Sequence, residues 1–163
     1  MAVILGVIAG LVPIGAGLAV IFDPIRRKAG ANNAIRVATL SALPADGVPR
    51  RFQVIANRTD AWNKYPEVPI GAVYLRRVGE KEVTALNVAC PHAGCFVDFS
   101  SAKGLFLCPC HNSSFAVNGS ISERNSPSPR PMDSLEVEIR NGTEIWVRFQ
   151  NFQAGEKAKV AMA

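Results

Sequence analysis

The sequence predicts a small all-β domain, a sandwich or a barrel, that follows one apolar N-terminal segment. The first observation is the run Val3–Phe22, which carries no charged residue in a chain of 163 residues. The second is Leu135–Phe149, where apolar and charged side chains alternate on both sides of Asn141-Gly142. This pattern is typical of two antiparallel strands joined by a two-residue turn. Further β-rich runs precede this hairpin: Ala34–Leu40, Arg50–Ala56, Ala72–Val78 and Glu82–Ala89.

The apolar run has the length and composition of a membrane span. At about 1.5 Å per helical residue it reaches roughly 30 Å, which is the thickness of a bilayer core. A cleaved signal peptide would begin with basic residues, and none precedes Val3. We therefore expect a transmembrane anchor over residues 1–22. Arg26, Arg27 and Lys28 follow the run, and the positive-inside rule would keep that side of the membrane in the cytoplasm.

Composition divides the rest of the chain. Lys28–Ala34 is small and polar without a hydrophobic period, so we expect a tether over residues 23–37. The β domain is expected over residues 38–152, with the polar, proline-containing stretch Asn57–Gly71 as a loop within it. Residues 153–163 are expected to form a frayed tail or a short helix. The net charge of +5 is scattered, without a run of basic residues, which argues against nucleic-acid binding.

All four cysteines and both histidines lie in two short runs, CPHAGC (Cys90–Cys95) and CPCHNSSF (Cys108–Phe115). A structural zinc site would group cysteines at one end and histidines at the other, whereas each run here holds both types. Two plain disulfides would leave the histidines unexplained, and a nucleophilic site needs only one cysteine and one histidine. A [2Fe–2S] cluster with two thiolates on one iron and two imidazoles on the other best explains why each run holds both a cysteine and a histidine.

The spacing of Cys90, His92, Cys108 and His111 resembles the signature of the Rieske iron–sulfur family. The resemblance implies a Rieske-type antiparallel β sandwich or barrel whose loops hold one [2Fe–2S] cluster. It further implies that Cys90 and Cys108 bind one iron and that His92 and His111 bind the other through Nδ1. Ser113 matches the family serine that donates a hydrogen bond to a cluster sulfur.

The remaining cysteines indicate a subclass. In the high-potential Rieske proteins of quinol-oxidising complexes a disulfide joins the two cluster loops, and Cys95 and Cys110 match its positions. A disulfide implies an oxidising compartment, which favours the periplasmic face of a bacterial-type plasma membrane over the side that the basic residues favour. A third match is SPSPRPM (Ser126–Met132), which is an ordinary surface turn or the family's proline-rich loop. In the family that loop covers the cluster, here with Ser126, Pro127, Ser128 and Pro129.

Three positions depart from the family pattern. Phe115 stands where quinol-oxidising members often have tyrosine, and a phenyl ring donates no hydrogen bond to a ligand sulfur. We therefore expect a lower reduction potential than that of tyrosine-bearing relatives. Ala93 replaces a larger apolar residue that often shields the cluster, so contact with solvent or quinone is expected to differ. Asn112 replaces a common glycine, and the sequence assigns no effect to it.

The resemblance implies the Rieske subunit of a cytochrome bc-type complex, an enzyme in which this chain serves electron transfer and is not active alone. Hydroquinone bound in a cytochrome b-type partner would give up one electron, and its proton would pass to His111 or, second, His92. The domain would then swing on its tether and reduce a c-type cytochrome. Alternatives are the small Rieske subunit of an arsenite-oxidase-like molybdenum enzyme and a stand-alone membrane-anchored electron carrier.

Overall fold

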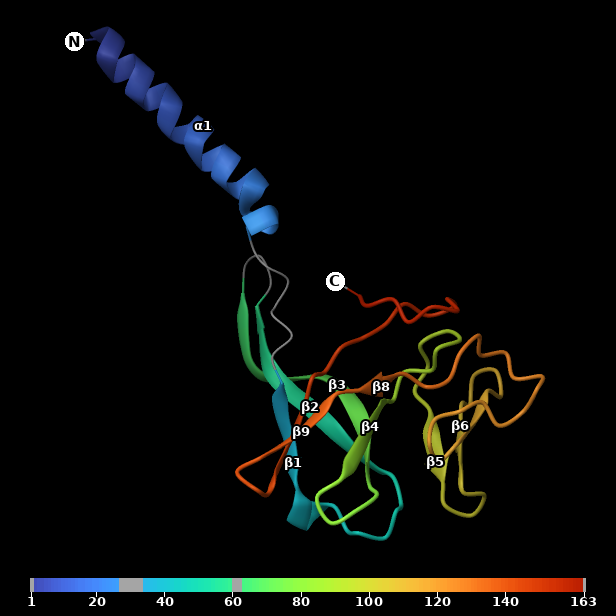
Figure 1. Ribbon diagram of the computed structural model, residues 1–163. Coiled ribbons are helices and arrows are strands. Elements are labelled where there is room, and N and C mark those ends of the chain that lie inside the picture. Colours follow the sequence, from blue (N-terminus) through green and yellow to red (C-terminus); the bar gives the residue numbers. More distant parts are fainter. Residues whose placement is uncertain (1, 27–33, 60–62, 163) are drawn as a thin grey trace. The chain divides into compact units, whose positions relative to one another are not determined.

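The computed structural model describes residues 2–26, 34–59 and 63–162, which fall into two compact units, Met1–Ala31 and Asn32–Ala163. The first unit contains helix α1, and the second contains all the strands (Figure 1). Residues 27–33 of the predicted tether lie outside the described residues.

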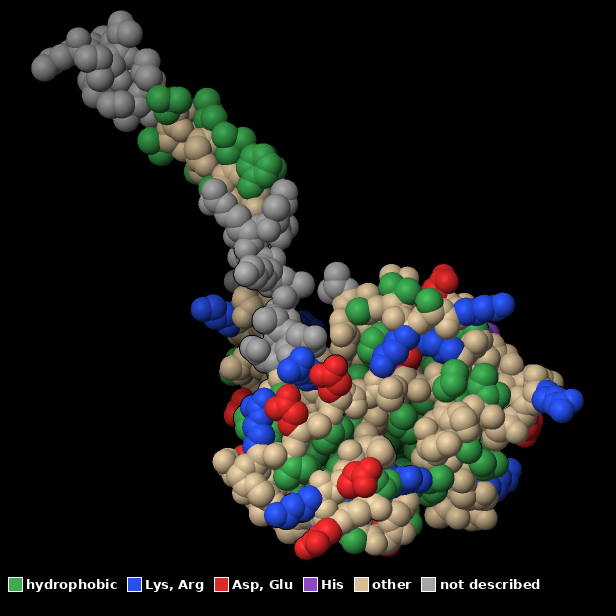
Figure 2. Space-filling model, in the orientation of Figure 1, with side chains coloured by type: hydrophobic (Ala, Val, Ile, Leu, Met, Phe, Trp, Pro, Cys, Tyr) green, Lys and Arg blue, Asp and Glu red, His purple; other side chains and the backbone are tan. Residues whose placement is uncertain are grey.

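Helix α1 (Ala2–Arg26) confirms that the apolar run is helical, and it continues four residues past the predicted end at Phe22. Its described large apolar side chains face solvent and appear in green in Figure 2. Among the described residues, however, no helix is both long enough and apolar enough to cross a membrane. The helix is thus confirmed, whereas the transmembrane anchor expected over residues 1–22 is not supported.

Over residues 34–59 and 63–162 the strands form three antiparallel sheets. The first has the order β1 (Ile35–Thr39), β10 (Glu144–Val147), β9 (Val137–Arg140). The predicted hairpin is present as β9–β10, but its turn holds Thr143 in addition to Asn141 and Gly142. Strand β1 begins inside the range that the sequence assigned to the tether, because Ile35 pairs with Val147.

The second sheet has the order β2 (Arg50–Thr59), β3 (Lys64–Arg77), β4 (Val83–Asn87), β8 (Ser134–Leu135). The loop predicted over Asn57–Gly71 is wrong, because β3 starts at Lys64 and pairs with β2 through Thr59. The prolines of this stretch, Pro66 and Pro69, fit a strand here because β4 pairs only with residues 73–77, which leaves one edge free. The two sheets enclose one core, which includes Leu43, Val54, Leu75 and Val147.

The third sheet is small and consists of β5 (Asp98–Ser100), β6 (Leu105–Leu107) and β7 (Ser114–Ala116). It lies in the chain between β4 and β8, and a second core packs beneath it around Phe106 and Phe115. Tyr74 of β3 joins this core, and its hydroxyl donates to the carbonyl of Val97 at 3.1 Å. The all-β prediction is confirmed, and the fold divides into a sandwich and a smaller unit that carries both cysteine runs.

The C-terminal residues do not fray as the sequence predicted. The chain folds back on itself, with a bridge between Phe152 and Ala161. The amide of Gln153 donates to the carbonyl of Val160, and the amide of Met162 donates to that of Asn151, both at 2.9 Å. The described tail therefore forms an irregular hairpin.

Candidate functional site

The two cysteine runs form loops with the same backbone turn. In the first loop, the amide of Cys90 donates to the carbonyl of Cys95, and the carbonyl of Cys90 accepts from the amide of Gly94, both at 2.8 Å. In the second, Cys108 makes the equivalent bonds to Ser113 at 2.8 Å and Asn112 at 3.1 Å. Each loop thus closes on a cysteine that is buried and whose thiol is free.

The residue four positions after each of these cysteines has a left-handed backbone. Gly94 has φ +77° and Asn112 has φ +59°. Glycine adopts this region at no steric cost, and asparagine tolerates it better than most residues. Asn112 therefore keeps the turn that glycine makes in the other loop, which explains the departure that the sequence left unassigned.

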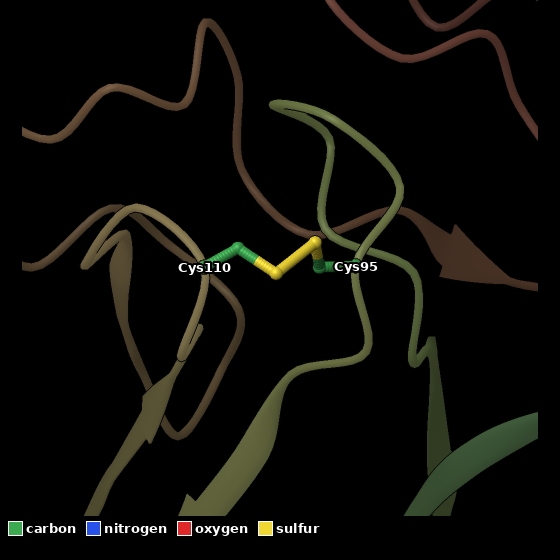
Figure 3. The surroundings of a disulfide bond; sticks show 2 residues. All are labelled: Cys95 and Cys110. Atoms are coloured by element: carbon green, nitrogen blue, oxygen red, sulfur yellow. A yellow bond between two sulfur atoms is a disulfide. The ribbon is translucent and has the colours of Figure 1, made fainter.

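A disulfide joins the loops between Cys95 and Cys110 (Figure 3), the pair that the resemblance implied. Their Cα atoms lie 6.5 Å apart. The sulfur of Cys108 lies within 4.8 Å of both disulfide sulfurs. Since the disulfide sulfurs are not thiolates, this group of three offers only Cys108 as a metal ligand.

The two histidines lie at the same end of the loops. Their ring centroids are 4.7 Å apart, and the ring planes are nearly perpendicular. His111 is exposed and His92 is half-buried. Among the described residues, Nδ1 of His92 and Oγ of Ser113 are buried polar atoms without a hydrogen-bond partner. Buried polar atoms normally have partners, so a group between the loops is expected to satisfy these two.

The donor set fits a [2Fe–2S] cluster. Each loop offers a free, buried thiol and an imidazole, which is the ligand set of a cluster with two cysteines and two histidines. Burial raises the pKa of the Cys90 thiol, and the backbone amide of His92 offsets part of that rise. A bound metal would favour the thiolate there, because a coordinating thiol is deprotonated.

The proline-rich stretch lies beside the same core. Ser126 and Pro127 are partly or fully exposed, Ser128 is buried and Pro129 is half-buried. Met132, which ends the stretch, packs in the cluster of buried side chains that contains Cys90, Cys108 and Phe115.

Three buried polar residues near the loops were missed by the sequence reasoning: Asn87, Arg130 and Asp133. Arg130 and Asp133 form a bidentate ion pair, with Nε to Oδ1 at 3.0 Å and Nη2 to Oδ2 at 2.8 Å. In a sequence, an arginine and an aspartate three residues apart normally indicate a solvent-exposed ion pair, because charged residues are rarely buried. Only their burial distinguishes them from such a pair.

Comparisons with known proteins agree with this geometry. The profile of the Rieske [2Fe–2S] domain matches residues 33–139. The menaquinol:cytochrome c reductase iron–sulfur subunit of Geobacillus thermodenitrificans is 31% identical over 124 residues, which are 74% of this chain and 70% of that protein. The chloroplastic cytochrome b6-f complex iron–sulfur subunit of Bigelowiella natans is 39% identical over 75 residues, 44% of this chain and 29% of that protein.

Among solved structures, a plasma membrane Rieske protein from the cyanobacterium Synechocystis PCC 6803 is 24% identical with a TM-score of 0.48, covering 69% of this chain and 97% of that one. The cytochrome b6-f relative is matched over less than a third of its length, whereas the menaquinol reductase subunit is matched over most of its own. With the profile matched across both cysteine loops, this chain belongs to the Rieske family, whose domain binds a [2Fe–2S] cluster.

Proposed function

We propose that this chain is the Rieske subunit of a cytochrome bc-type complex and that it carries electrons from hydroquinone to a c-type cytochrome. The observation that carries the proposal is the Cys95–Cys110 disulfide, which ties together two loops that each hold a free buried cysteine. Support also comes from the relatives, whose names give them as iron–sulfur subunits of a menaquinol:cytochrome c reductase and of the cytochrome b6-f complex.

The proposed ligands follow the burial of the two loops. Cys90 and Cys108, both buried, hold one iron, and His92 and His111 hold the other. When bound, the cluster supplies a one-electron acceptor whose imidazole ligands raise its reduction potential above that of an all-cysteine cluster. The buried hydroxyl of Ser113 would donate a hydrogen bond to a sulfur of the bound cluster, which would favour the more negative reduced state.

The proposed catalytic groups are the Nε2 atoms of His92 and His111, the ring nitrogens that would not bind iron. His111 is the more exposed, so its ring can accept a hydrogen bond from a quinol hydroxyl and then hold the proton. His92 is the second candidate, because it is half-buried. Ser126, Pro127, Ser128 and Pro129 are proposed to cover a third side of the site, where the two prolines offer no backbone donor to water.

The proposed partners are a cytochrome b-type subunit that binds the quinol and a c-type cytochrome that accepts the electron. The disulfide favours an oxidising compartment, so we propose that the domain lies on the periplasmic face of a bacterial-type plasma membrane. Association with that membrane is proposed through the complex, as the names of the relatives suggest.

The proposal is tested by an EPR-monitored redox titration of membranes that carry the protein, beside the double variant Cys95→Ser/Cys110→Ser. The double variant breaks the disulfide without leaving a free thiol that could replace a ligand. We expect a positive midpoint in the wild type, within a family range of about −150 to +300 mV, and a lower midpoint or loss of the signal in the variant.

The matched control is Ser101→Ala, an exposed substitution between the loops that leaves the disulfide intact. Menaquinol is then added to the membranes, and reduction of a c-type cytochrome is followed. A midpoint near the bottom of the range that the double variant leaves unmoved would indicate a ferredoxin-like carrier. Reduction of the centre by arsenite but not by quinol would indicate a molybdenum-enzyme subunit instead.

A further inference from the structure

The C-terminal hairpin, residues 150–162, is ordered although most of its side chains are exposed. Its backbone is held to the rest of the domain by buried polar side chains. The first is Asn87 at the end of β4, whose Nδ2 donates to the carbonyl of Gln150 at 2.9 Å. Its Oδ1 accepts from the amide of Ala89, also at 2.9 Å. One amide group thus joins the start of the hairpin to the residue that precedes Cys90.

The second is Arg130, which is 6% exposed and lies within the proline-rich stretch. Its fork binds Asp133 and also reaches the hairpin, where Nη2 donates to the carbonyl of Gln153 at 3.0 Å and Nη1 donates to that of Glu156. The backbone carbonyl of Arg130 in turn accepts from the hydroxyl of Ser128 at 2.8 Å. Arg130 therefore fixes the hairpin to the proline-rich loop.

Between the two carbonyls that Arg130 holds lies Gly155, and it contacts the first cluster loop. The amide of Gly155 donates to the carbonyl of Pro91 at 2.8 Å. Pro91 is fully buried and stands between Cys90 and His92. Gly155 has φ +81°, a conformation that favours glycine. The guanidinium of Arg130 thus orients the peptide whose N–H binds the backbone between two proposed ligands.

We propose that Arg130, Asp133 and the C-terminal hairpin form a brace that positions Cys90 and His92. The role given to these two ligands rests on the proposed function, whereas the contact at Pro91 does not. Arg130 is a positioning residue, since it acts through Gly155 and Pro91. Its charge is paired with that of Asp133, so replacing both residues together leaves the net charge near the loops unchanged.

The experiment uses the full chain with Arg130→Leu/Asp133→Leu. Replacing both partners avoids the unpaired buried carboxylate that Arg130→Leu alone would leave, and it keeps the net charge unchanged. A second variant ends after Phe152, and a third combines both changes. The matched control is Arg124→Leu, the same side-chain change at an exposed position before the proline-rich stretch.

Two measurements are made on each protein: hydrogen exchange in the peptide that covers residues 88–95, and the EPR spectrum and midpoint of the reduced cluster. We expect exchange at the amides of Cys90 and Gly94 to quicken at least about tenfold in all three variants. In the same variants we expect the EPR line shape and the midpoint of the cluster to shift. Exchange in β10 should stay as in the wild type. The control Arg124→Leu should match the wild type in every measurement. The combined variant is no worse than either parent, because both remove the same contact.

Unchanged exchange in residues 88–95 would overturn the proposal, as would faster exchange with an unaltered EPR spectrum and midpoint. Additive effects in the combined variant would also overturn it, because Arg130 and the hairpin would then act separately. A His92→Ala protein that keeps its cluster would instead refute the ligand assignment, and the exchange result for residues 88–95 would still stand.

Discussion

Phe115 packs beneath the two cysteine loops. It is fully buried, pairs with Phe106 across β6 and β7, and packs in the core that contains Cys90 and Cys108. Its ring fills space but offers no hydrogen-bond donor to a ligand sulfur.

Phe115→Tyr is expected to raise the midpoint of the cluster. A phenol that donates to a ligand sulfur stabilises the reduced state, by an amount on the order of 50 mV for one electron. Redox titration of the variant checks this, with Phe99→Tyr as a control on the same core. A midpoint that stays at the wild-type value would show that Phe115 serves packing alone.

At this scale the sequence was most informative where chemistry depends on residue type and spacing. The positions of Cys90, His92, Cys108 and His111 indicated the centre because few other sites need that set. The roles of Asn112 and Arg130 could not be predicted. The first depends on a backbone angle of +59°, and the second depends on burial beside residues far along the chain.

Among the elements, strand β3 is the one whose structure differs most from expectation. Its first half contains Pro66 and Pro69, which made the stretch resemble a loop, and only the free edge of the sheet explains why a strand forms. The tail differs for a related reason, since its order comes from hydrogen bonds to Asn87 and Arg130 that no local pattern reveals.

A close approach within the second sheet gives a test of this strand. Gly71 of β3 pairs with Val54 beside a bulge, and a Cβ there would lie 2.2 Å from Cζ of Phe149. We expect Gly71→Ala to lower the free energy of unfolding by about 1–3 kcal/mol, because the ring of Phe149 must move. Chemical denaturation measures the loss.

The cost should fall when the same change is made in Phe149→Leu, since the shorter side chain leaves room for the methyl group. An equal cost in both backgrounds would place the strain in the backbone of the bulge instead.

The folded domain as a whole has two cores that differ in what stabilises them. The sandwich core is built from apolar side chains, such as Val54, Leu75 and Ile145. The core beneath the third sheet contains Cys90 and Cys108, the proposed iron ligands. Metal binding is therefore expected to stabilise one core far more than the other.

Removal of iron with a chelator and reductant should open the smaller unit alone. We expect amide exchange in residues 88–133 to rise about a hundredfold and exchange in β9 and β10 to change little. Exchange mass spectrometry before and after iron removal measures both regions. A uniform rise over the whole domain would show that the two cores unfold together.

Strands β4 and β8 pair antiparallel, with Leu86 opposite Ser134, and the amide of Asn87 donates to the carbonyl of Asp133 at 2.8 Å. The smaller unit, which carries both cysteine runs, is therefore one continuous chain segment whose two ends lie on the neighbouring strands β4 and β8. The entropic cost of closing a loop between two fixed strands grows only slowly with the length of the loop. The scaffold can thus accept loops of different sizes between the same two strands, and the cluster-binding part is modular with respect to the sandwich that supports it.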